Sequence, residues 1–446
     1  MNTDYAESRH HEVRKTRLLM VDGRLVNNQR SVDAAASARV HEGGYWGFAS
    51  SADAPGDGTL LDQARRNARS MSRFGARGAA PLPADSHVGE HELQGAPPLT
   101  GAQAIERLRA LDAWCRTRHP GLTSVRLLAQ EERHDKRLLT STGSRCRSVI
   151  ARGTLQVTMT AGARDGAPVE LTDTWSCAGS LADLALDAET LAPQLDRLHA
   201  HLRAKCDPVP ARGGEHVVVL APRLAGMLAH EAMGHPCEAD IVIGGAVTRE
   251  LVGQRVASEL VTMVDFAHSW NGRRVLMPVY VDDEGVPARD AVLIERGVLK
   301  DFMTSRETAA RLGRPVTGSA RAYGPHDEPL VRMRNTAILP GTSRLDEMIA
   351  GVDDGYLLLA TGNGQADSTT EFMFGVTLAY EIRGGRLGRA VRDTTVSGSA
   401  LHMLQTVDAV SDDMHWEAAG YCGKKQPMVV SMGGPALRAR AHLGGE

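Results

Sequence analysis

The sequence has few of the features that would direct a protein to a membrane or to nucleic acid. Its 51 basic and 54 acidic residues nearly balance, at a formal net charge of −3, so it carries no electrostatic footprint for a phosphate backbone. No run of about 18 apolar residues occurs, and charges fill the N-terminal segment where a signal peptide would need an apolar stretch. We therefore expect a cytoplasmic protein with no nucleic-acid partner and no membrane span.

Cysteines and aromatic residues are also few. The six cysteines are scattered without a dense spacing, which argues against a disulfide framework in a chain with no export signal. Aromatic residues make up only 4 % of the chain, so Ala, Val and Leu must fill the interior, with 16 Met as adaptable filler. Most cysteines should be reduced thiols in the core, and Cys422 is the exception considered below.

The length and the mixed pattern of the first half predict an α+β protein of more than one domain. A chain of 446 residues is too long for one ordinary hydrophobic core, and two or three domains are expected. Short alternating strands are predicted over 17–50, around a turn at Asp22-Gly23. A loop is expected over 76–99. Helices are predicted over 59–74, 101–117 and 180–205. Further strands are predicted over 123–133, 136–145 and 153–163.

The second half is predicted to form a separate, strand-rich domain. Residues 206–214 contain two prolines and two glycines, which is typical of a linker, so we place the domains at 1–205 and 206–446. A helix should begin near Pro222, and a largely antiparallel β structure should follow it. Strands are predicted over 258–265, 275–281, 290–295, 298–303, 355–360, 371–382 and 427–432.

The hexapeptide His-Glu-Ala-Met-Gly-His, which runs from His230 to His235, carries the chemistry of a water-activating metal site. Neutral imidazole is a good zinc ligand, and Glu231 can point at a metal-activated water instead of at the metal. The two histidines are five residues apart, which in a regular α-helix turns the second about 140° away from the first. We therefore predict a wide π-type turn here, or a helix that ends at Gly234.

A catalytic metal usually has a third protein ligand, and Cys422 is the best candidate. Glycines flank it and lysines follow, which should allow a close approach and favour the thiolate. Cys237 and Glu238 are further donors near His235, but a thiol in that position is more often packed in the core. Gly362, Gly364 and Gln365, in the segment Gly-Asn-Gly-Gln-Ala-Asp, could line a peptide groove, although a plain β-turn is an equally good interpretation.

Several sequence blocks in fixed order resemble the TldD/PmbA family of peptidases. After HEAMGH come ASELVTMVD (257–265), VDDEGVP (281–287), VLIERGVLKDFMTSRETAARLG (292–313), MRNTAILPG (333–341), GNGQAD (362–367) and GYCGKKQP (420–427). The resemblance reaches the first half through DYAE, VDGRL, GYWGFASS and QARRNARSM. The family usually shows HEAVGHGLEGD, whereas this chain has Pro236, Cys237 and Ala239, and its segment after Cys422 is slightly shorter. These departures bear on the shape of the substrate cleft and leave the proposed ligands and Glu231 in place.

The resemblance implies a two-domain α+β metallopeptidase in which His230, His235 and Cys422 hold a divalent metal, with zinc expected. It implies that Glu231 is the general base and that short or unfolded peptides are the substrates. It also implies a site enclosed in a dimer, either a homodimer or a heterodimer with a related TldE/PmbA-like subunit that lacks the metal motif. This chain resembles the subunit that carries the motif.

Three other functions fit part of the sequence. The chain could be a catalytically silent subunit of such a heterodimer, although the intact HEAMGH argues against this. It could be an amide-cleaving enzyme dedicated to the maturation of a peptide natural product. It could also be a cysteine hydrolase in which Cys422 acts with a histidine, which requires that the thiolate be free of metal.

Overall fold

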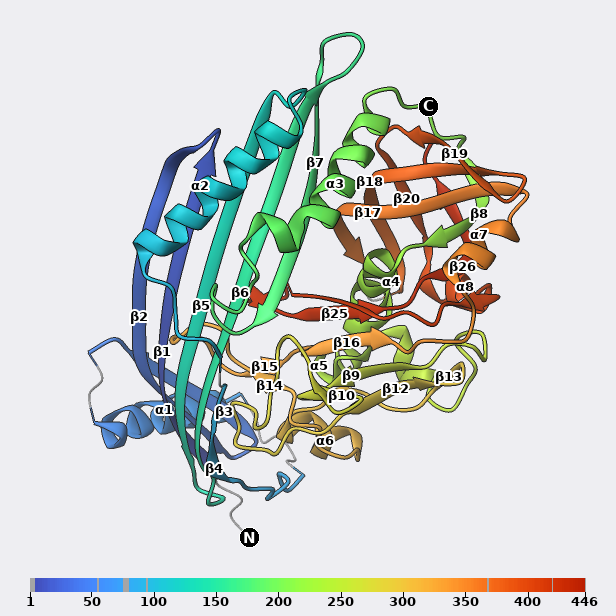
Figure 1. Cartoon of the computed structure of the whole chain (residues 1–446). Helices are drawn as coiled ribbons and strands as arrows, with labels where there is room; N and C mark the ends of the chain where they lie inside the picture. Colours follow the sequence, from blue (N-terminus) through green and yellow to red (C-terminus); the bar gives the residue numbers. More distant parts are fainter. Residues whose placement is uncertain are drawn as a thin grey trace.

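A computed structural model describes residues 5–53, 56–74, 80–93, 95–366, 369–418 and 420–445. The fold is a mixture of helices and strands, as expected, with one large sheet in the first half and two in the second (Figure 1). None of the described helices is both long and apolar enough to cross a membrane. All six cysteines are free thiols, and five of them are buried.

The first half is built on a sheet of long strands in the order β3-β2-β1-β5-β6-β4, with β7 also paired to β6. The short strands predicted over 17–50 are wrong, because β1 begins at Tyr5 and β2 alone has 19 residues. The segments 123–133 and 136–145 are likewise one strand, β5. The strands are β1 Tyr5–Val21, β2 Arg24–Glu42, β3 Tyr45–Ser51, β4 Val88–Glu92, β5 Ser124–Thr140, β6 Arg145–Gly162 and β7 Pro168–Ala178.

The full length of these strands was not predicted because, near the start of β1 and the end of β2, one buried face carries charged residues instead of apolar ones. In β1, Glu7 and Arg9 are buried, and Arg39 lies directly opposite Glu7 on β2. Arg39 donates hydrogen bonds to the carboxylates of Glu7 and of Glu284 in the second half. A strand whose buried face is ion-paired shows no hydrophobic alternation, so the pattern that identifies a half-buried strand is missing.

Three helices complete the first half: α1 Asp57–Ser72, α2 Gly101–Arg118 and α3 Ala188–Lys205. α1 packs on β2 and β3, whereas α2 and α3 cover the apolar face of the sheet. α3 begins eight residues later than predicted, because the Asp187 side chain accepts a hydrogen bond from the backbone N–H of Thr190 and caps the helix there.

The loop predicted over 76–99 contains a strand, which corrects that prediction. β4 lies parallel to β6 and presents an exposed edge, with no apolar alternation in its sequence. Backbone pairing with β6 places it in the sheet, and Glu90 and Glu92 also form ion pairs with Arg147 and Arg133. Residues 76–79 and 94 of this segment lie outside the described residues.

In the second half, five strands close into a ring in the order β17-β8-β26-β20-β18, with β18 returning to β17. Only β17 and β8 run parallel in this ring. Two further strands lie outside the closed ring: β19 pairs with β18, and β21 pairs with β26. The strands are β8 Gly214–Leu220, β17 Asp354–Ala366, β18 Glu371–Arg383, β19 Arg386–Val391, β20 Thr394–Ser399, β21 Ala409–Val410 and β26 Leu437–Leu443.

A six-stranded sheet in the order β13-β12-β9-β16-β25-β22 packs below the ring (Figure 1). Its strands are β9 Met263–Phe266, β12 Ala291–Glu295, β13 Val298–Leu299, β16 Asn335–Ile338, β22 His415–Glu417 and β25 Ser431–Gly434. Of the segment predicted as a strand over 258–265, only the last part, from Met263, forms a strand. The segment predicted as a strand over 275–281 is irregular backbone with a single bridge at Val281. Three two-stranded pairs are β10 Ser269–Trp270 with β11 Arg273–Arg274, β14 Ala320–Arg321 with β15 Leu330–Val331, and β23 Tyr421–Cys422 with β24 Met428–Val429.

Short helices connect these strands, and one of them leads into the site. α4 Pro222–Leu228 begins after β8, as predicted, and packs against β25 and β17. The others are α5 Ala239–Ile243, η3 Val247–Glu250, α6 Arg306–Leu312, α7 Leu345–Ala350 and α8 Ala400–Gln405. The core behind α2 and α3 extends to Ala360 and Leu378 of the ring, so the halves share apolar contacts. The boundary at 205 stays a prediction.

We predict that Gly47→Ala destabilises the first half. A Cβ at this position would lie 1.9 Å from the carbonyl oxygen of Ala64 in α1, so helix and strand would have to separate, at a cost of about 1–3 kcal/mol. Gly58→Ala, in the first turn of the same helix, is the matched control because no atom lies within 4 Å of the added Cβ. Thermal unfolding should show a lowered Tm for the first variant only.

Candidate metal centre

The helix that carries the two histidines widens where they stand. α4 ends at Leu228, a π-helical turn follows over Ala229–Gly234 (η1), and a 3-10 turn completes it over His235–Cys237 (η2). The backbone N–H of His235 donates to the carbonyl of His230, which is the five-residue bond of a π-helix. The predicted distortion is confirmed, and it sets the two rings 5.0 Å apart between centroids.

Local sequence explains why the widened turn is stable. A Cβ on Gly234 would lie 2.2 Å from the sulfur of Met333, two residues before β16, so a glycine allows the turn to pass this close to the Met333 side chain. Pro236 cannot donate a backbone hydrogen bond, so a regular α-helix could not continue through it without loss. The π-helical turn is also buried against β16, β17, β18 and β25.

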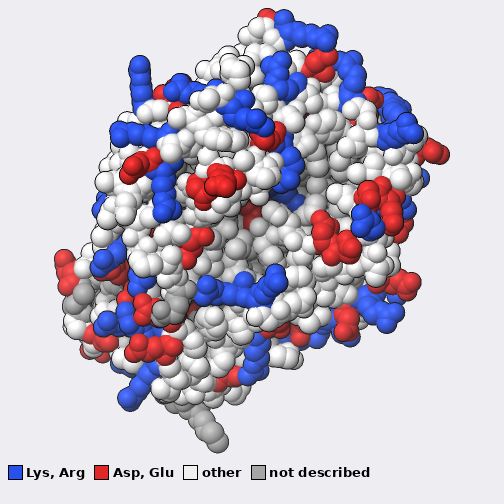
Figure 2. Space-filling model, in the orientation of Figure 1, with Lys and Arg blue, Asp and Glu red and all other residues white. Residues whose placement is uncertain are grey.

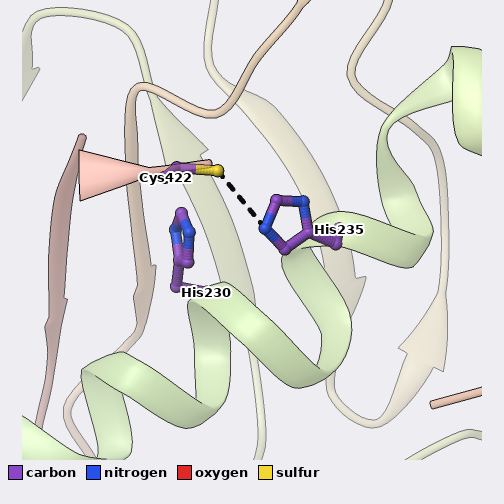
Figure 3. A group of neighbouring side chains, drawn as sticks. All are labelled: His230, His235 and Cys422. Carbon is purple, nitrogen blue, oxygen red and sulfur yellow. Dashed lines mark hydrogen bonds between the residues drawn. The ribbon is translucent and has the colours of Figure 1, made fainter. Parts of the chain in front are cut away.

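Cys422 comes to the two histidines from the far end of the chain (Figure 3). Its Sγ lies 3.3 Å from Nε2 of His235, and one ligand atom from each of the three residues lies within 4.8 Å of the other two. Within the part of the chain that the structure describes, this is the one group of three or more His, Cys, Asp or Glu side chains close enough to share a metal.

A buried arginine holds the Cys422 segment in place. Arg332 donates hydrogen bonds to the carbonyl oxygens of Cys422, Lys424 and Gln426, at 2.7 to 3.0 Å. The flanking glycines are not needed for a close approach, because a Cβ on Gly423 would meet no atom within 4 Å. Sequence reasoning missed Arg332, which is fully buried and stands immediately before the block MRNTAILPG, because no pattern in the sequence marks its role.

A carboxylate orients the second imidazole. Oε2 of the fully buried Glu238 lies 2.7 Å from Nδ1 of His235, which leaves Nε2 facing Cys422. The ammonium group of Lys424 lies 3.2 Å from the same oxygen and also binds Asp240. Lys424 is therefore paired with these two carboxylates and not with the Cys422 thiolate. Burial alone would raise the pKa of Glu238, but Lys424 and His235 lower it to about 2. Glu238 is thus an anionic support for His235.

The imidazoles, and not the lysines, favour the thiolate form of Cys422. Burial alone would raise the pKa of this thiol, but the adjacent His230 and His235, the latter in hydrogen-bond contact with the sulfur, lower it to about 4. Burial would likewise lower the pKa of His235, but the Glu238 carboxylate and the Cys422 sulfur raise it to about 10. The sulfur is therefore held as the form that ligates metals.

Glu231 lies at the edge of the group, next to both imidazoles. Its carboxylate oxygens are 3.9 Å from Nε2 of His230 and 3.6 Å from Nε2 of His235, and its side chain keeps 18 % of its surface exposed. Cys237, in contrast, is fully buried in the apolar core, and burial raises its thiol pKa. The structure thus places Cys237 among packed residues, outside the ligand group.

The three residues predicted to contact substrate lie in strand β17. Gly362 and Gln365 are exposed, and Gly364 pairs with Phe374 of β18 across an irregular register. The segment is thus not a plain β-turn, and Asp367 lies outside the described residues. β17 and β18 both contact the π-helical turn, but no described contact joins these three residues to the ligands. Their role stays a prediction.

A cleft of about 370 Å³ lies between the two halves, beside the start of α4. It is lined by α3 and β7 on one side and by α4, β17 and β18 on the other. The surface shown in Figure 2 is hollowed near its centre, where these elements meet. Arg223 of α4 stands in this cleft and is paired with Asp173 and Glu417, so its charge is already balanced.

Comparisons with known proteins identify the class of protein. Residues 213–443 match the family described as the PmbA/TldA metallopeptidase C-terminal domain, and residues 6–68 match its domain 1. A protein named zinc metalloprotease TldD homolog, from Saccharolobus solfataricus, is 31% identical over 342 residues, which cover 76% of this chain and 75% of that protein. A metalloprotease from Methanothermobacter thermautotrophicus is 30% identical over 99% of this chain and 96% of its own. The chain therefore belongs to the TldD/PmbA family of metallopeptidases.

Solved structures show the same fold at low sequence identity. TldE from Thermococcus kodakarensis superposes with a TM-score of 0.72 at 17% identity, over 98% of this chain and 96% of that chain. A Thermotoga maritima protein described as a putative modulator of a DNA gyrase gives 0.74 at 17% identity, with the same coverage. The α+β fold predicted from sequence is thus shared along nearly the whole length.

We predict that Gly234→Ala lowers the affinity for a divalent metal by about 10-fold or more, because the added Cβ would push the π-helical turn away from Met333 and move His235. Gly423→Ala, next to Cys422 in open space, is the matched control and should bind the metal like the wild type. Competition with a chromophoric chelator measures both affinities. Equal affinity in the two variants would contradict the role given to the close approach at Gly234.

Proposed function

We propose that this chain is a metal-dependent peptidase that hydrolyses the amide bonds of short or unfolded peptides. The observation that carries the proposal is the convergence of His230, His235 and Cys422, whose ligand atoms lie within 4.8 Å of one another. Two imidazole nitrogens and a thiolate form a donor set that suits zinc, so zinc is the metal we expect.

The three side chains fit a metal by their own chemistry. Nδ1 of His230 is buried without a hydrogen-bond partner among the described groups, so the protein does not fully use this imidazole. His235 is oriented from behind by Glu238, as metal-binding histidines commonly are. Among the described residues three protein donors converge, which is the number that catalytic sites use when one position is kept for water or substrate.

We assign the role of general base to Glu231. When bound, the metal would act as a Lewis acid and lower the pKa of the attacking water. Glu231 is close enough to both imidazoles to take the proton of that water and to pass it to the leaving amine. Its partial exposure leaves room for the water, whereas Glu238 is fully buried and already bonded to His235.

The substrate and partner assignments extend the same proposal. An extended peptide can be held as an added strand, and the exposed Gly362 and Gln365 on β17 are candidates to contact it, together with Gly364. The family and the fold shared with TldE support assembly as a homodimer or as a heterodimer with a TldE/PmbA-like subunit. A role confined to one biosynthetic pathway, or a silent scaffold role, remains the alternative; stoichiometric metal in the purified protein would argue against the scaffold.

We predict that Glu231→Ala keeps the metal and loses peptide hydrolysis by at least about 100-fold, because the general base is removed while all three ligands remain. His230→Ala should lose both the metal and the activity. Glu250→Ala, an exposed carboxylate on η3, should change neither. Metal analysis beside a peptide digestion assay separates these roles, and a fully active Glu231→Ala enzyme would overturn the assignment of the base.

A cysteine hydrolase is the second candidate function. It is favoured by the 3.3 Å contact between Cys422 Sγ and His235 Nε2 and by the low pKa of the thiol, because a thiolate beside an imidazole is also a nucleophile with its base. The same sulfur cannot ligate a metal and attack a carbonyl. The two functions therefore exclude each other.

Chelation distinguishes the two candidates. We predict that removal of the metal abolishes hydrolysis and that added zinc restores it, because the thiolate serves as a ligand. The assay is peptide hydrolysis before chelation, after chelation and after zinc addition, with dialysis against buffer alone as the control. Activity that survives complete removal of the metal would favour the thiol mechanism.

A further inference from the structure

The residue next to Cys422 is tied to the sheet of the first half. Tyr421 and Cys422 form β23, so their side chains point to opposite sides of the strand. The Tyr421 hydroxyl donates to Oε1 of Glu132 at 2.8 Å and accepts from Nη2 of Arg152 at 3.2 Å. Tyr421 therefore faces the first half while Cys422 faces the imidazoles.

A second contact ties the preceding residues of the same segment. Arg152 also donates through Nη1 to the carbonyl oxygen of Ala418. The backbone N–H of Ala418 donates to the hydroxyl of Ser176 on β7, at 3.4 Å. The backbone on the N-terminal side of Cys422 is thus held by β6 and β7, more than 240 residues away in sequence.

Glu132 and Arg152 form a fixed anchor for these contacts. They lie directly opposite each other on β5 and β6, are 4% and 3% exposed, and are bonded at 3.2 Å. Burial alone would raise the pKa of Glu132, but the nearby His134, at 4.0 Å, the charge of Arg152 and the hydrogen bond from Tyr323 hold it below its ordinary range. A buried pair with most of its hydrogen bonds satisfied is rigid, because each lost bond would leave a charge without a partner.

Cys422 is therefore placed between two anchors that belong to different halves. Arg332, in the second half, fixes the carbonyl of Cys422 from one side. Glu132 and Arg152, in the first half, fix Tyr421 and Ala418 from the other. We propose that Glu132 and Arg152 are positioning residues that hold Cys422 in place for metal binding, so that the sheet of the first half completes a site whose ligands all lie in the second. This inference rests on the proposed function of Cys422 as a ligand.

The central test removes one hydroxyl. Tyr421→Phe deletes both contacts of the phenol and keeps the ring. Tyr5→Phe, on β1, is the control, because the hydroxyl of Tyr5 also lies between the halves, 2.6 Å from Oε2 of Glu7 and 2.9 Å from the carbonyl oxygen of Glu284. Tyr5 is buried, whereas Tyr421 is 47% exposed, so the control removes the better-buried hydroxyl of the two. Both variants lose a tyrosine hydroxyl from the contact between the two halves, but at different positions in that contact. Tm values of the metal-free proteins show whether each variant is folded.

The readout is Co²⁺, a spectroscopic substitute for zinc whose bond to a thiolate gives an intense charge-transfer absorption. We expect the wild-type complex to show this absorption. We expect Tyr421→Phe to bind Co²⁺ about 10-fold or more weakly, or to lose part of the absorption at saturation, whereas Tyr5→Phe should match the wild type within about two-fold. Peptide hydrolysis by the zinc-loaded proteins is measured in parallel.

Glu132→Gln, alone and combined with Tyr421→Phe, tests whether the two residues act through one contact. If they do, the losses of Co²⁺ affinity in the single variants should not add in the double variant. Additive losses, or unchanged affinity and absorption in folded Tyr421→Phe, would overturn the inference. A loss of kcat/KM in Tyr421→Phe at unchanged Co²⁺ affinity would also overturn it, since Tyr421 would then act on the substrate. A wild-type complex without the absorption would instead refute the proposed ligand role of Cys422.

Discussion

The site depends on one backbone hydrogen bond, from the N–H of His235 to the carbonyl of His230. In a regular α-helix these two side chains would diverge by about 140°, and no movement of their rotamers could bring both imidazoles to one ion. The single π-helical turn absorbs this difference. It is stable only because Gly234 lets the chain pass close to Met333 and because tertiary packing on four strands replaces what a regular helix would supply.

Around this turn, ion pairs and hydrogen bonds join Glu238, Lys424 and Asp240, and hydrogen bonds from Arg332 hold the Cys422 segment. Glu238 supports His235, Lys424 lies between Glu238 and Asp240, and the carbonyls that precede and follow Lys424 bind Arg332. These contacts link the loop after Cys422 to the segment after His235. The sulfur and the second imidazole are therefore not positioned independently, because Lys424 and Glu238 belong to the same buried chain of charges.

How much of this could be predicted from sequence differs between the site and the fold. His230, Glu231, His235 and Cys422 could be chosen as candidates because metal chemistry restricts residue types, and the structure brings them together. The need for a distorted helix followed from the spacing of the two histidines. Arg332 was not identified, since an arginine that binds only carbonyls leaves no pattern. The strands β1 and β5 were predicted too short for a related reason. Part of their buried face carries charges that pair with residues far away in sequence.

The polar face of the first sheet, which made its strands hard to predict from sequence, also joins the two halves. Near one end of the sheet Arg39 reaches Glu284, and midway along β5 and β6 Glu132 and Arg152 reach Tyr421 and Ala418, before Cys422. Apolar contacts tolerate small shifts in register, whereas buried ion pairs and hydrogen bonds lose most of their energy when a partner moves. A charged interface therefore specifies one relative position of the sheet and the Cys422 segment, and a site completed from two distant parts of the chain requires such a specification.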